Sequence, residues 1–236
     1  MQLFYSKNIK NGIAALDDME ARHAVQVLRR KVGDALQLTD GEGNLYDGTI
    51  IEIGKKNCLI GINSTISAYN ERPIKLHIAI APTKNIDRFE WFLEKATEIG
   101  ITEITPLICK RSEREVIKWD RLNGVLLSAM KQSLKAYLPR LNEAIGFQKF
   151  MKSNFTEGSH FMGHCIEGTE KQLLSQLYKK DDNCVILIGP EGDFTEGEVA
   201  MALSKNFQAV SLGDSRLRTE TAGVVACHTV NLLNEF

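Results

Sequence analysis

Two glycine-containing segments near the end of the chain carry the residue types best suited to hold a ligand. Cys184–Ile188 is an apolar run typical of a parallel strand buried on both faces, and the turn Gly189–Gly192 follows at once. Glycines at both ends of this turn allow backbone angles that other residues resist, and they leave no side chain between main chain and ligand. Thr195 and Glu198 then form a capping-box pattern that begins a helix. The succession predicts a ligand-binding edge of an open α/β sheet, although a tight connection without a ligand has the same pattern.

The second segment, residues 211–222, also follows an apolar run and precedes a helical pattern. Arg216 and Arg218 alternate with Leu217, so one guanidinium can face a ligand while the leucine packs. Glu220 is placed to clamp one of these arginines. The segment is therefore either the second half of a ligand site or a solvent-facing Arg/Glu pair at a helix start.

Other common chemistries find little support. There is no GxxxxGK[ST] or GxSxG pattern, and Gly41–Gly43 lies between two strand patterns, which disfavours ATP hydrolysis, hydride transfer and serine hydrolysis. His160 and His164 can share a strand face, but without a third ligand they do not predict a metal site. Cys109 and Cys227 are weak candidates for a nucleophile.

Composition sets the class of protein. The chain has 236 residues, of which 43% are hydrophobic and 25% charged, as in a globular protein with one large and one smaller domain. The net charge of −1 shows no bulk basic footprint for nucleic acid, so RNA binding would depend on local clusters. Five scattered cysteines without a CxxC pair are interpreted as reduced, buried thiols. Because no long apolar segment or secretory signal occurs, we expect a cytoplasmic protein without membrane contact.

The first seventy residues are dominated by short strand patterns. Residues 32–40, 45–54 and 56–63 alternate apolar and polar side chains around Gly41 and Gly43, which predicts a hairpin and a further strand. A helix is predicted at Asp18–Arg30. The product is a small β-barrel with one helix, followed by a linker near residues 70–73.

From residue 73 onward strands alternate with helices. A strand at 74–81 leads to a helix that begins near Asp87, with Glu90 completing a capping box and Gly100 ending it. A strand at 101–108, a helix at 119–136 and three further strand–helix pairs follow, the first of which has its helix at 169–178. This alternation predicts a layered α/β domain with a largely parallel sheet.

Basic residues form three local clusters: Arg29-Arg30-Lys31, Lys110-Arg111 with Arg114, and Lys131 with Lys135, one helical turn apart. Each cluster alone is typical of a solvated surface. Clusters that flank one cleft would instead hold several phosphates.

These segments together resemble a known family. TKNIDRFEWFLEKATEIGI, KRSER, KQSLKAYLP, LIGPEGDFTEGE and SLGDSRLRTETA occur in the order found in the RsmE family of small-subunit ribosomal RNA methyltransferases, members of the SPOUT superfamily. HAVQVLRRKVGDALQLTDGEGNLYDG is similar to the N-terminal PUA-like barrel of that family, so the resemblance covers nearly the whole chain.

The resemblance implies S-adenosylmethionine-dependent methylation of N3 of a uridine in 16S ribosomal RNA, within the 30S subunit. It implies an α/β fold with a SPOUT-type parallel sheet and a C-terminal trefoil knot, a PUA-like RNA-binding β-barrel at 1–72, a methyltransferase domain at 73–236, and a homodimer. A SPOUT enzyme acting on another RNA such as transfer RNA, or a noncatalytic RNA-binding module, remains the alternative.

Site residues follow from the same resemblance, with no metal. The cofactor would lie between two groups of residues, which are Ile188, Gly189, Glu191 and Gly192 on one side and Leu212, Gly213, Leu217 and Arg218 on the other. Catalysis would use Arg218 to stabilise negative charge on the uracil, with Glu220 orienting it. RNA would be bound by Arg29, Arg30, Lys31, Arg111, Arg114, Gln132 and Lys135.

Three positions depart from the family pattern. Asp193 stands where a glycine is usual, which brings the geometry of that turn into question. Lys135 stands where an arginine is usual and keeps the charge without the planar two-pronged contact. The start MQLFY lacks an arginine common near the N-terminus of the family.

Overall fold

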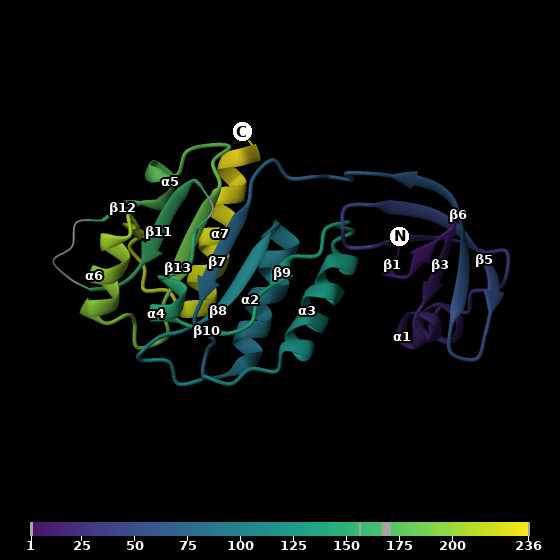
Figure 1. The fold of residues 1–236 in the computed structure, drawn as a ribbon, viewed down its shortest axis with the longest axis horizontal. Coiled ribbons are helices and arrows are strands. Elements are labelled where there is room, and N and C mark those ends of the chain that lie inside the picture. The colour runs from purple at the N-terminus through teal and green to yellow at the C-terminus, as the bar shows by residue number, and fades with distance from the viewer. Residues whose placement is uncertain (1, 156, 167–170, 236) are drawn as a thin grey trace. The chain divides into compact units, whose positions relative to one another are not determined.

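The computed structural model describes residues 2–155, 157–166 and 171–235, which form two compact units (Figure 1). Unit 1 comprises Met1–Arg72 and Leu127–Leu138, and unit 2 comprises Pro73–Leu126 and Pro139–Phe236. The sequence places a single boundary between residues 72 and 73, whereas residues 127–138 join unit 1. They do so through backbone hydrogen bonds, from the Gly43 amide to the Ala136 carbonyl and from the Leu138 amide to the Gly41 carbonyl, both 2.9 Å long.

Unit 1 is built on a curled six-stranded sheet with the order β1-β4-β5-β6-β3-β2. The alternating segments predicted as strands form β4, β5 and β6, whose inward side chains, such as Leu38, Ile50 and Ile60, are fully buried. The strands are β1 (Leu3–Tyr5), β2 (Ile9–Lys10), β3 (Ile13–Leu16), β4 (Ala35–Thr39), β5 (Leu45–Ile53) and β6 (Cys58–Ile66).

The helix of unit 1 is shorter than the sequence predicts. The α-helix α1 covers Asp18–Arg22, a π-helical turn continues over His23–Val27, and Arg29 adopts a left-handed φ of 56° that ends the helical path. The Asp17 side chain caps α1 by accepting from the Glu20 amide at 2.9 Å.

A buried ion pair ties residues 127–138 into unit 1. The Glu20 side chain is only 3% exposed, and one of its carboxylate oxygens accepts from the Tyr5 amide at 3.1 Å. Its other oxygen binds the ammonium of Lys131. Removing one partner of a buried pair leaves an uncompensated charge, which costs about 3–5 kcal/mol.

Unit 2 is built on a parallel sheet with the order β10-β8-β7-β13-β11-β14-β12, and β9 pairs with β8. The prediction of a parallel sheet is confirmed, and Cys184–Ile188 is buried throughout, between two parallel neighbours. Because every pairing is parallel, the carboxyl ends of all strands share one edge of the sheet. The strands are β7 (Leu76–Ile80), β8 (Glu103–Ile108), β9 (Arg140–Leu141), β10 (Ile145–Gly146), β11 (Ser159–Gly163), β12 (Gln172–Leu173), β13 (Cys184–Ile188) and β14 (Gln208–Ser211).

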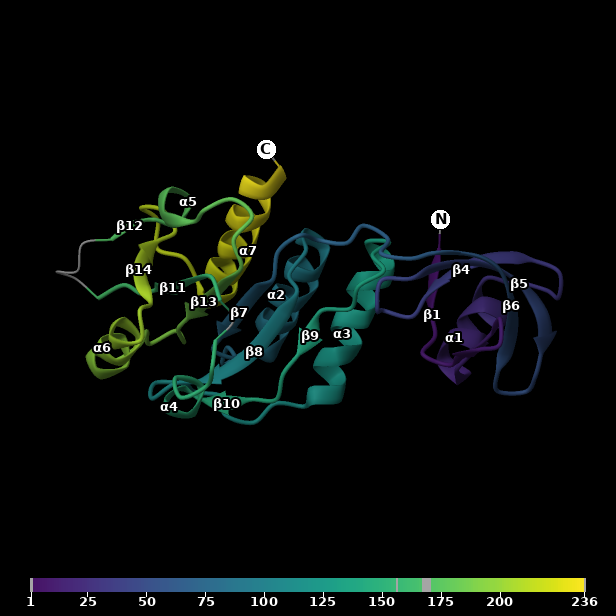
Figure 2. The same cartoon turned by 45° about the horizontal axis from the view of Figure 1, so that its top comes forward.

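Helices cover both faces of this sheet (Figure 2). On one face α2 (Ile86–Ile99) and α7 (Thr219–Glu235) pack against each other and against β7. On the other, a core that includes Ala79 and Phe194 lies beneath α4 (Phe147–Phe150) and α6 (Glu196–Ser204). Successive strand residues point to opposite faces, and Ile80 accordingly lies beside Gly223 of α7 while Ala79 faces α6.

Several helix ends differ from the sequence prediction. The cap of α2 is Asn85, whose side chain accepts from the Asp87 amide at 3.1 Å, and Gly100 at φ 126° ends the helix as predicted. Helix α3 covers Trp119–Gln132 and stops before residue 136, since Leu134 is left-handed at φ 55°. The helix predicted over residues 169–178 is reduced to α5 (Leu174–Leu177), and its first two positions lie outside the described residues. In the described part of the chain, no helix combines the length and apolarity needed to cross a bilayer.

Candidate active site

The two glycine-bearing segments meet at the carboxyl edge of the sheet. The Thr219 hydroxyl, at the start of α7, donates a 3.1 Å hydrogen bond to the Gly189 carbonyl at the end of β13. Gly163 of β11 lies between the two segments, because a side chain there would meet Ile188 at 3.4 Å and Leu212 at 3.9 Å. The predicted convergence of these segments is therefore present in the fold.

The glycines of the first turn are needed for space. A Cβ on Gly189 would lie 2.9 Å from the Phe194 ring, and one on Gly192 would lie 3.3 Å from Arg111. The left-handed residue is Asp193, at φ 62°, whose amide closes the turn on the Pro190 carbonyl at 2.9 Å. Asp tolerates this conformation better than most residues. Asp193 therefore occupies the position of this turn that requires a left-handed backbone. This corrects the expectation that Gly189 and Gly192 supply the unusual backbone angles.

Asp193 also fastens a third segment to the site. One oxygen of its carboxylate accepts from the Phe194 amide and the other from the Cys165 amide, both at 2.8 Å. Cys165 follows β11, so the carboxylate joins the end of that strand to the turn after β13. The motifs of the sequence do not include this third segment; its signal is an apolar strand that ends at Gly163 and is followed at once by a histidine.

His164 is that histidine, and it brings an unsatisfied donor to the edge. Its side chain is buried, its Nδ1 accepts from the Ile166 amide at 3.2 Å, and its Nε2 has no partner among the described residues. Burial, with the positive charge of Lys171, lowers the pKa of His164, although Asp193 opposes this. The ring is therefore neutral at pH 7, and its proton lies on Nε2 because Nδ1 accepts. A buried N–H without an acceptor needs a further partner, which an ordered water or a ligand atom supplies.

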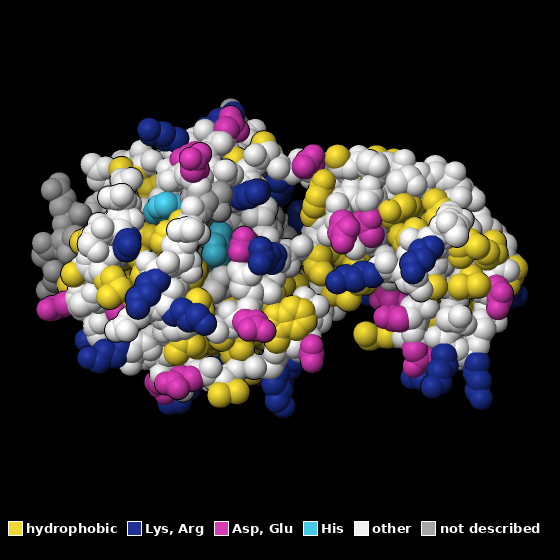
Figure 3. Space-filling view, in the orientation of Figure 1, with side chains coloured by type: hydrophobic (Ala, Val, Ile, Leu, Met, Phe, Trp, Pro, Cys, Tyr) yellow, Lys and Arg dark blue, Asp and Glu magenta, His cyan; other side chains and the backbone are white. Residues whose placement is uncertain are grey.

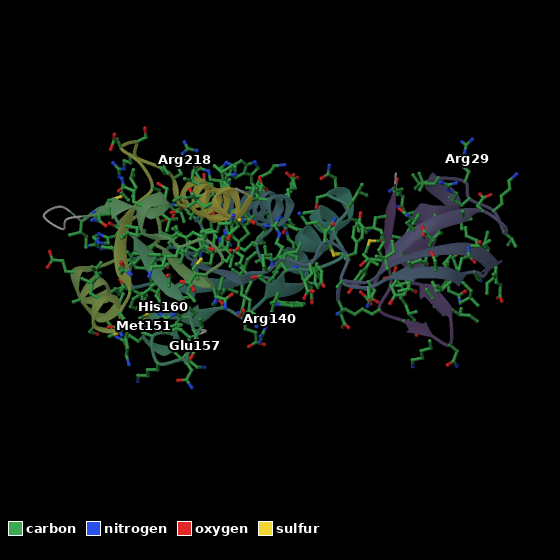
Figure 4. All side chains as sticks on the ribbon, turned by 90° about the horizontal axis from the view of Figure 1, so that it is seen from above. Arg29, Arg140, Met151, Glu157, His160 and Arg218 are labelled. Atoms are coloured by element: carbon green, nitrogen blue, oxygen red, sulfur yellow. The ribbon has the colours of Figure 1, made fainter. Side chains whose placement is uncertain are left out.

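A cavity of about 580 Å³ opens beside the start of α7. Arg218 lines it and is exposed; Figure 4 shows this side chain near the beginning of α7. Glu220 is buried, and its carboxylate lies 3.9 Å from the Nε of Arg88. Arg88 is thus the ion-pair partner of Glu220 in the described part of the chain, instead of Arg216 or Arg218 as the spacing suggests. The remaining lining residues are Asp87, Trp91, Arg216, Leu217 and Thr221.

The other residues predicted to hold a cofactor lie along the same edge. Ile188 is the buried last residue of β13, Gly213 is left-handed at φ 124°, and Leu212 is half-buried. Glu191 is exposed and accepts from the Lys84 amide at 2.9 Å. Its carboxylate therefore positions the segment that follows β7.

The residues predicted to bind RNA are divided between the units. Arg111 donates to the Gly192 carbonyl at 2.8 Å, and Arg114 donates to the Lys84 carbonyl at 2.7 Å, so both guanidinium groups hold the backbone of the site. In unit 1, Lys131 and Lys135 do not share a helix face as predicted, because α3 ends at Gln132 and Lys131 binds Glu20. The remaining predicted residues of unit 1, which are all exposed, are Arg29, Arg30, Lys31 and Gln132.

Metal chemistry and cysteine chemistry have no geometric basis in what the structure describes. Residues 2–155, 157–166 and 171–235 contain no group of three side chains suited to a metal ion. His160 instead stacks on Phe207, with ring centroids 5.1 Å apart, at a position labelled in Figure 4. Cys165 is exposed, which corrects the expectation that the thiols are buried, while the other four are buried.

Comparison with known proteins points to one family. The family described as RNA methyltransferase domain matches residues 70–231, and the RNA methyltransferase PUA domain matches residues 16–63. Ribosomal RNA small subunit methyltransferase E of Rickettsia conorii is 30% identical over 94% of this chain and 90% of its own.

Two solved structures are similar over almost their whole length. A probable rRNA-methyltransferase from Porphyromonas gingivalis is 40% identical with a TM-score of 0.93, covering 100% of this chain and 99% of its own. Ribosomal RNA small subunit methyltransferase E from Neisseria gonorrhoeae, bound to S-adenosyl methionine, is 28% identical with a TM-score of 0.85, covering 96% of this chain and 95% of its own.

Proposed function

The chain belongs to the ribosomal RNA small subunit methyltransferase E family, and on this premise we propose that it methylates N3 of a uridine in 16S ribosomal RNA, with S-adenosylmethionine as donor. The observation that carries the proposal is the convergence of three strand ends, where Thr219 binds Gly189 and Asp193 binds Cys165. S-adenosylmethionine in a bent conformation offers many hydrogen-bond acceptors, which suits an edge of the sheet whose polar groups are mostly those of the backbone. The Nε2 of His164, which has no partner among the described residues, supports this fit, since an adenosyl group offers an acceptor.

S-adenosylmethionine, when bound, supplies an electrophilic methyl group. The chain itself then has to align uridine N3 with that group and exclude water. Arg218 stabilises the negative charge that develops on the uracil oxygens as N3 loses its proton. Glu220 forms an ion pair with Arg88, and both residues line the same cavity as Arg218. Glu220 therefore acts on Arg218 indirectly, through the shape and charge of the cavity wall.

Finer features of the family belong to the same proposal. Residues 1–72, joined by residues 127–138, act as a PUA-like RNA-binding domain, and the rest of residues 73–236 acts as the methyltransferase domain, which ends in a trefoil knot. The position of β11 between β13 and β14 supports such a crossing of the chain. The substrate is the 30S subunit in the cytoplasm.

The proposed enzyme is a homodimer. Trp91 of α2 is 43% exposed and Leu232 of α7 is 39% exposed, on two helices that pack side by side. Large apolar side chains on adjacent helices support a subunit interface on this face of unit 2.

Light scattering should give twice the mass calculated from the sequence, and Trp91→Glu should shift the protein toward the monomer.

The activity is tested by incubating the purified protein with labelled S-adenosylmethionine and unmodified 30S subunits, 16S RNA or transfer RNA. Nucleoside mass spectrometry should find N3-methyluridine in the ribosomal RNA with wild-type protein. Methylation confined to transfer RNA, or at another atom of the base, would overturn the proposed substrate. Absence of calorimetric binding of S-adenosylmethionine would overturn the enzymatic proposal and favour an RNA-binding module.

A further inference from the structure

A second cavity, of about 710 Å³, lies at the same edge of the sheet and has no part in holding the cofactor segments. Ile108–Lys110 enter it from the end of β8, Gly146 and Phe147 from the end of β10, and Thr195 from the start of α6. Parallel strands place these ends on the edge that also holds the convergent turns. Thr195 lies three positions after Gly192. Three extended residues span at most about 10 Å, so the cavity begins close to the turn.

The charged side chains that line this cavity are mostly basic. Lys110, Lys149 and Lys152 line it and are exposed, and none of their ammonium groups forms an ion pair in the part of the chain that the structure describes. Glu198 is the acidic lining residue, but its carboxylate is already bound by the Lys110 amide at 2.9 Å and the Thr195 amide at 2.8 Å. The cavity therefore presents three lysines that form no ion pair among the described residues, while the carboxylate of Glu198 is held by backbone amides.

Part of the remaining wall is apolar, beside the polar side chains of Gln148 and Thr195. Phe147 is buried beneath the cavity, Ile108 is half-buried, and Met201 of α6 is 36% exposed. Figure 3 shows Lys and Arg side chains over the region of α4 and α6, with hydrophobic side chains exposed between them. An apolar wall beside free lysines is the combination that binds the base and the phosphate of a single-stranded nucleotide.

We propose that this cavity binds a nucleotide of the RNA substrate that flanks the methylated base. The inference rests on the proposed function, because it requires that RNA reaches this edge of the sheet. The base packs against Ile108 and Met201, above the buried Phe147, and the neighbouring phosphates contact Lys149 and Lys152. A negatively charged peptide would contact the lysines but would leave the apolar side chains of Ile108 and Met201 uncovered.

The test compares Lys149→Ala/Lys152→Ala with the matched control Lys179→Ala/Lys180→Ala. The control lysines are also exposed and precede β13, so they lie at the opposite, amino edge of the sheet. Binding of a single-stranded RNA that spans the target uridine is measured by fluorescence anisotropy at several salt concentrations. We expect the cavity variant to bind about tenfold more weakly and to flatten the slope of log K against log salt by about 0.7 for each phosphate that is no longer neutralised. The control should stay within about twofold of wild type.

A second readout locates the nucleotide and separates it from bulk charge. RNA with single 4-thiouridine substitutions is photocrosslinked, and peptides that contain Phe147 or Met201 should be labelled from a position flanking the target. Equal RNA binding by the two double variants, or crosslinks to neither peptide, would overturn the inference, as would stronger competition by polyglutamate than by unlabelled RNA. If wild-type protein binds and crosslinks RNA here but produces no N3-methyluridine, the proposed function fails while the binding site stands.

Discussion

Two exposed arginines, Arg216 and Arg218, precede α7 and line the same cavity, and the proposed catalytic role is assigned to Arg218. Arg218 is adjacent to Thr219, whose hydroxyl binds the Gly189 carbonyl, whereas Arg216 lies farther out on the loop. Arg218→Ala should reduce kcat by about 100-fold, the usual loss when a donor to a developing oxyanion is removed. The melting temperature should change little, because the Arg218 side chain is exposed.

Arg216→Ala serves as the matched control and should keep kcat within about threefold of wild type. Steady-state methylation of 30S subunits measures both variants. Equal losses in the two variants would assign the effect to the charge of the loop and contradict a specific role for Arg218.

His164 provides a test of the cofactor site that does not depend on turnover. Calorimetry with S-adenosylmethionine should show about tenfold weaker binding by His164→Ala, or about 1.4 kcal/mol, the value of one hydrogen bond. Cys165→Ala removes the neighbouring side chain but keeps the backbone amide bound by Asp193, so its affinity should match wild type. Unchanged affinity in His164→Ala would place the ring outside the cofactor site.

The same histidine affects stability at low pH. Burial, with the charge of Lys171, lowers the pKa of His164 in the folded protein below the 6.5 of the unfolded chain. As the pH falls, the unfolded state therefore takes up the proton before the folded state does. The stability that comes from the neutral His164 ring is present above about pH 6.5 and is lost as the pH falls below that value. Urea unfolding at pH 7.5 and 5.5 should show a smaller loss of free energy in His164→Ala than in wild type. An equal loss would show that the ring is not held neutral.

Sequence reasoning found part of this site and missed the rest for identifiable reasons. Gly189 and Gly192 were predictable because an apolar strand directly precedes them. The partner of Glu220 was not, because Arg88 lies on another helix more than a hundred residues earlier. The role of Asp193 depends on its left-handed backbone and on an amide after β11, neither of which leaves a local pattern.

At the scale of elements, the packing of α7 on α2 depends on a glycine. A Cβ on Gly223 would lie 2.7 Å from the Phe92 ring and 2.8 Å from Ile80, both fully buried. Gly223→Ala should destabilise the protein by about 1–3 kcal/mol, as overpacking does. Gly124 of α3 has open space around it, so Gly124→Ala should instead stabilise the protein by about 0.5–1 kcal/mol.

Urea unfolding monitored by circular dichroism gives both free energies. The two variants are expected to change the free energy of unfolding in opposite directions. The comparison is informative because both variants replace a glycine within a helix by alanine. Tolerance of Gly223→Ala would mean that the two helices pack less closely than described.

Strands were more predictable than helix ends in this chain. The strands β5, β6 and β13 follow from their apolar patterns, since period-two alternation or continuous apolarity leaves a clear signal. Helices α1 and α3 end earlier than their periodicity suggests, because Arg29 and Leu134 adopt left-handed angles that their residue types do not signal. The assignment of residues 127–138 to unit 1 rests on backbone bonds to distant residues, which no local pattern encodes.

For the whole molecule, thiol chemistry offers a simple check. Cys165 is exposed and the other four cysteines are buried. Burial raises the pKa of Cys58 and Cys109, and that of Cys184 to about 12, so these thiols stay protonated at pH 8. A chromogenic disulfide reagent should titrate one thiol in the native protein and five in urea. Cys165→Ser should abolish the native reaction, and two or more fast thiols would contradict the described burial.

The buried Glu20 has a consequence for how the molecule is made. Its counter-ion, Lys131, is synthesised more than a hundred residues later, after the chain has already begun the parallel sheet of unit 2. A nascent chain that carries only residues 1–72 lacks the counter-ion of Glu20 and the backbone bonds from Gly43 to Ala136 and from Leu138 to Gly41, so the first unit is incomplete as it leaves the exit tunnel. Pulse proteolysis of arrested ribosome complexes should therefore find protection of the N-terminal strands only after residue 138 has emerged.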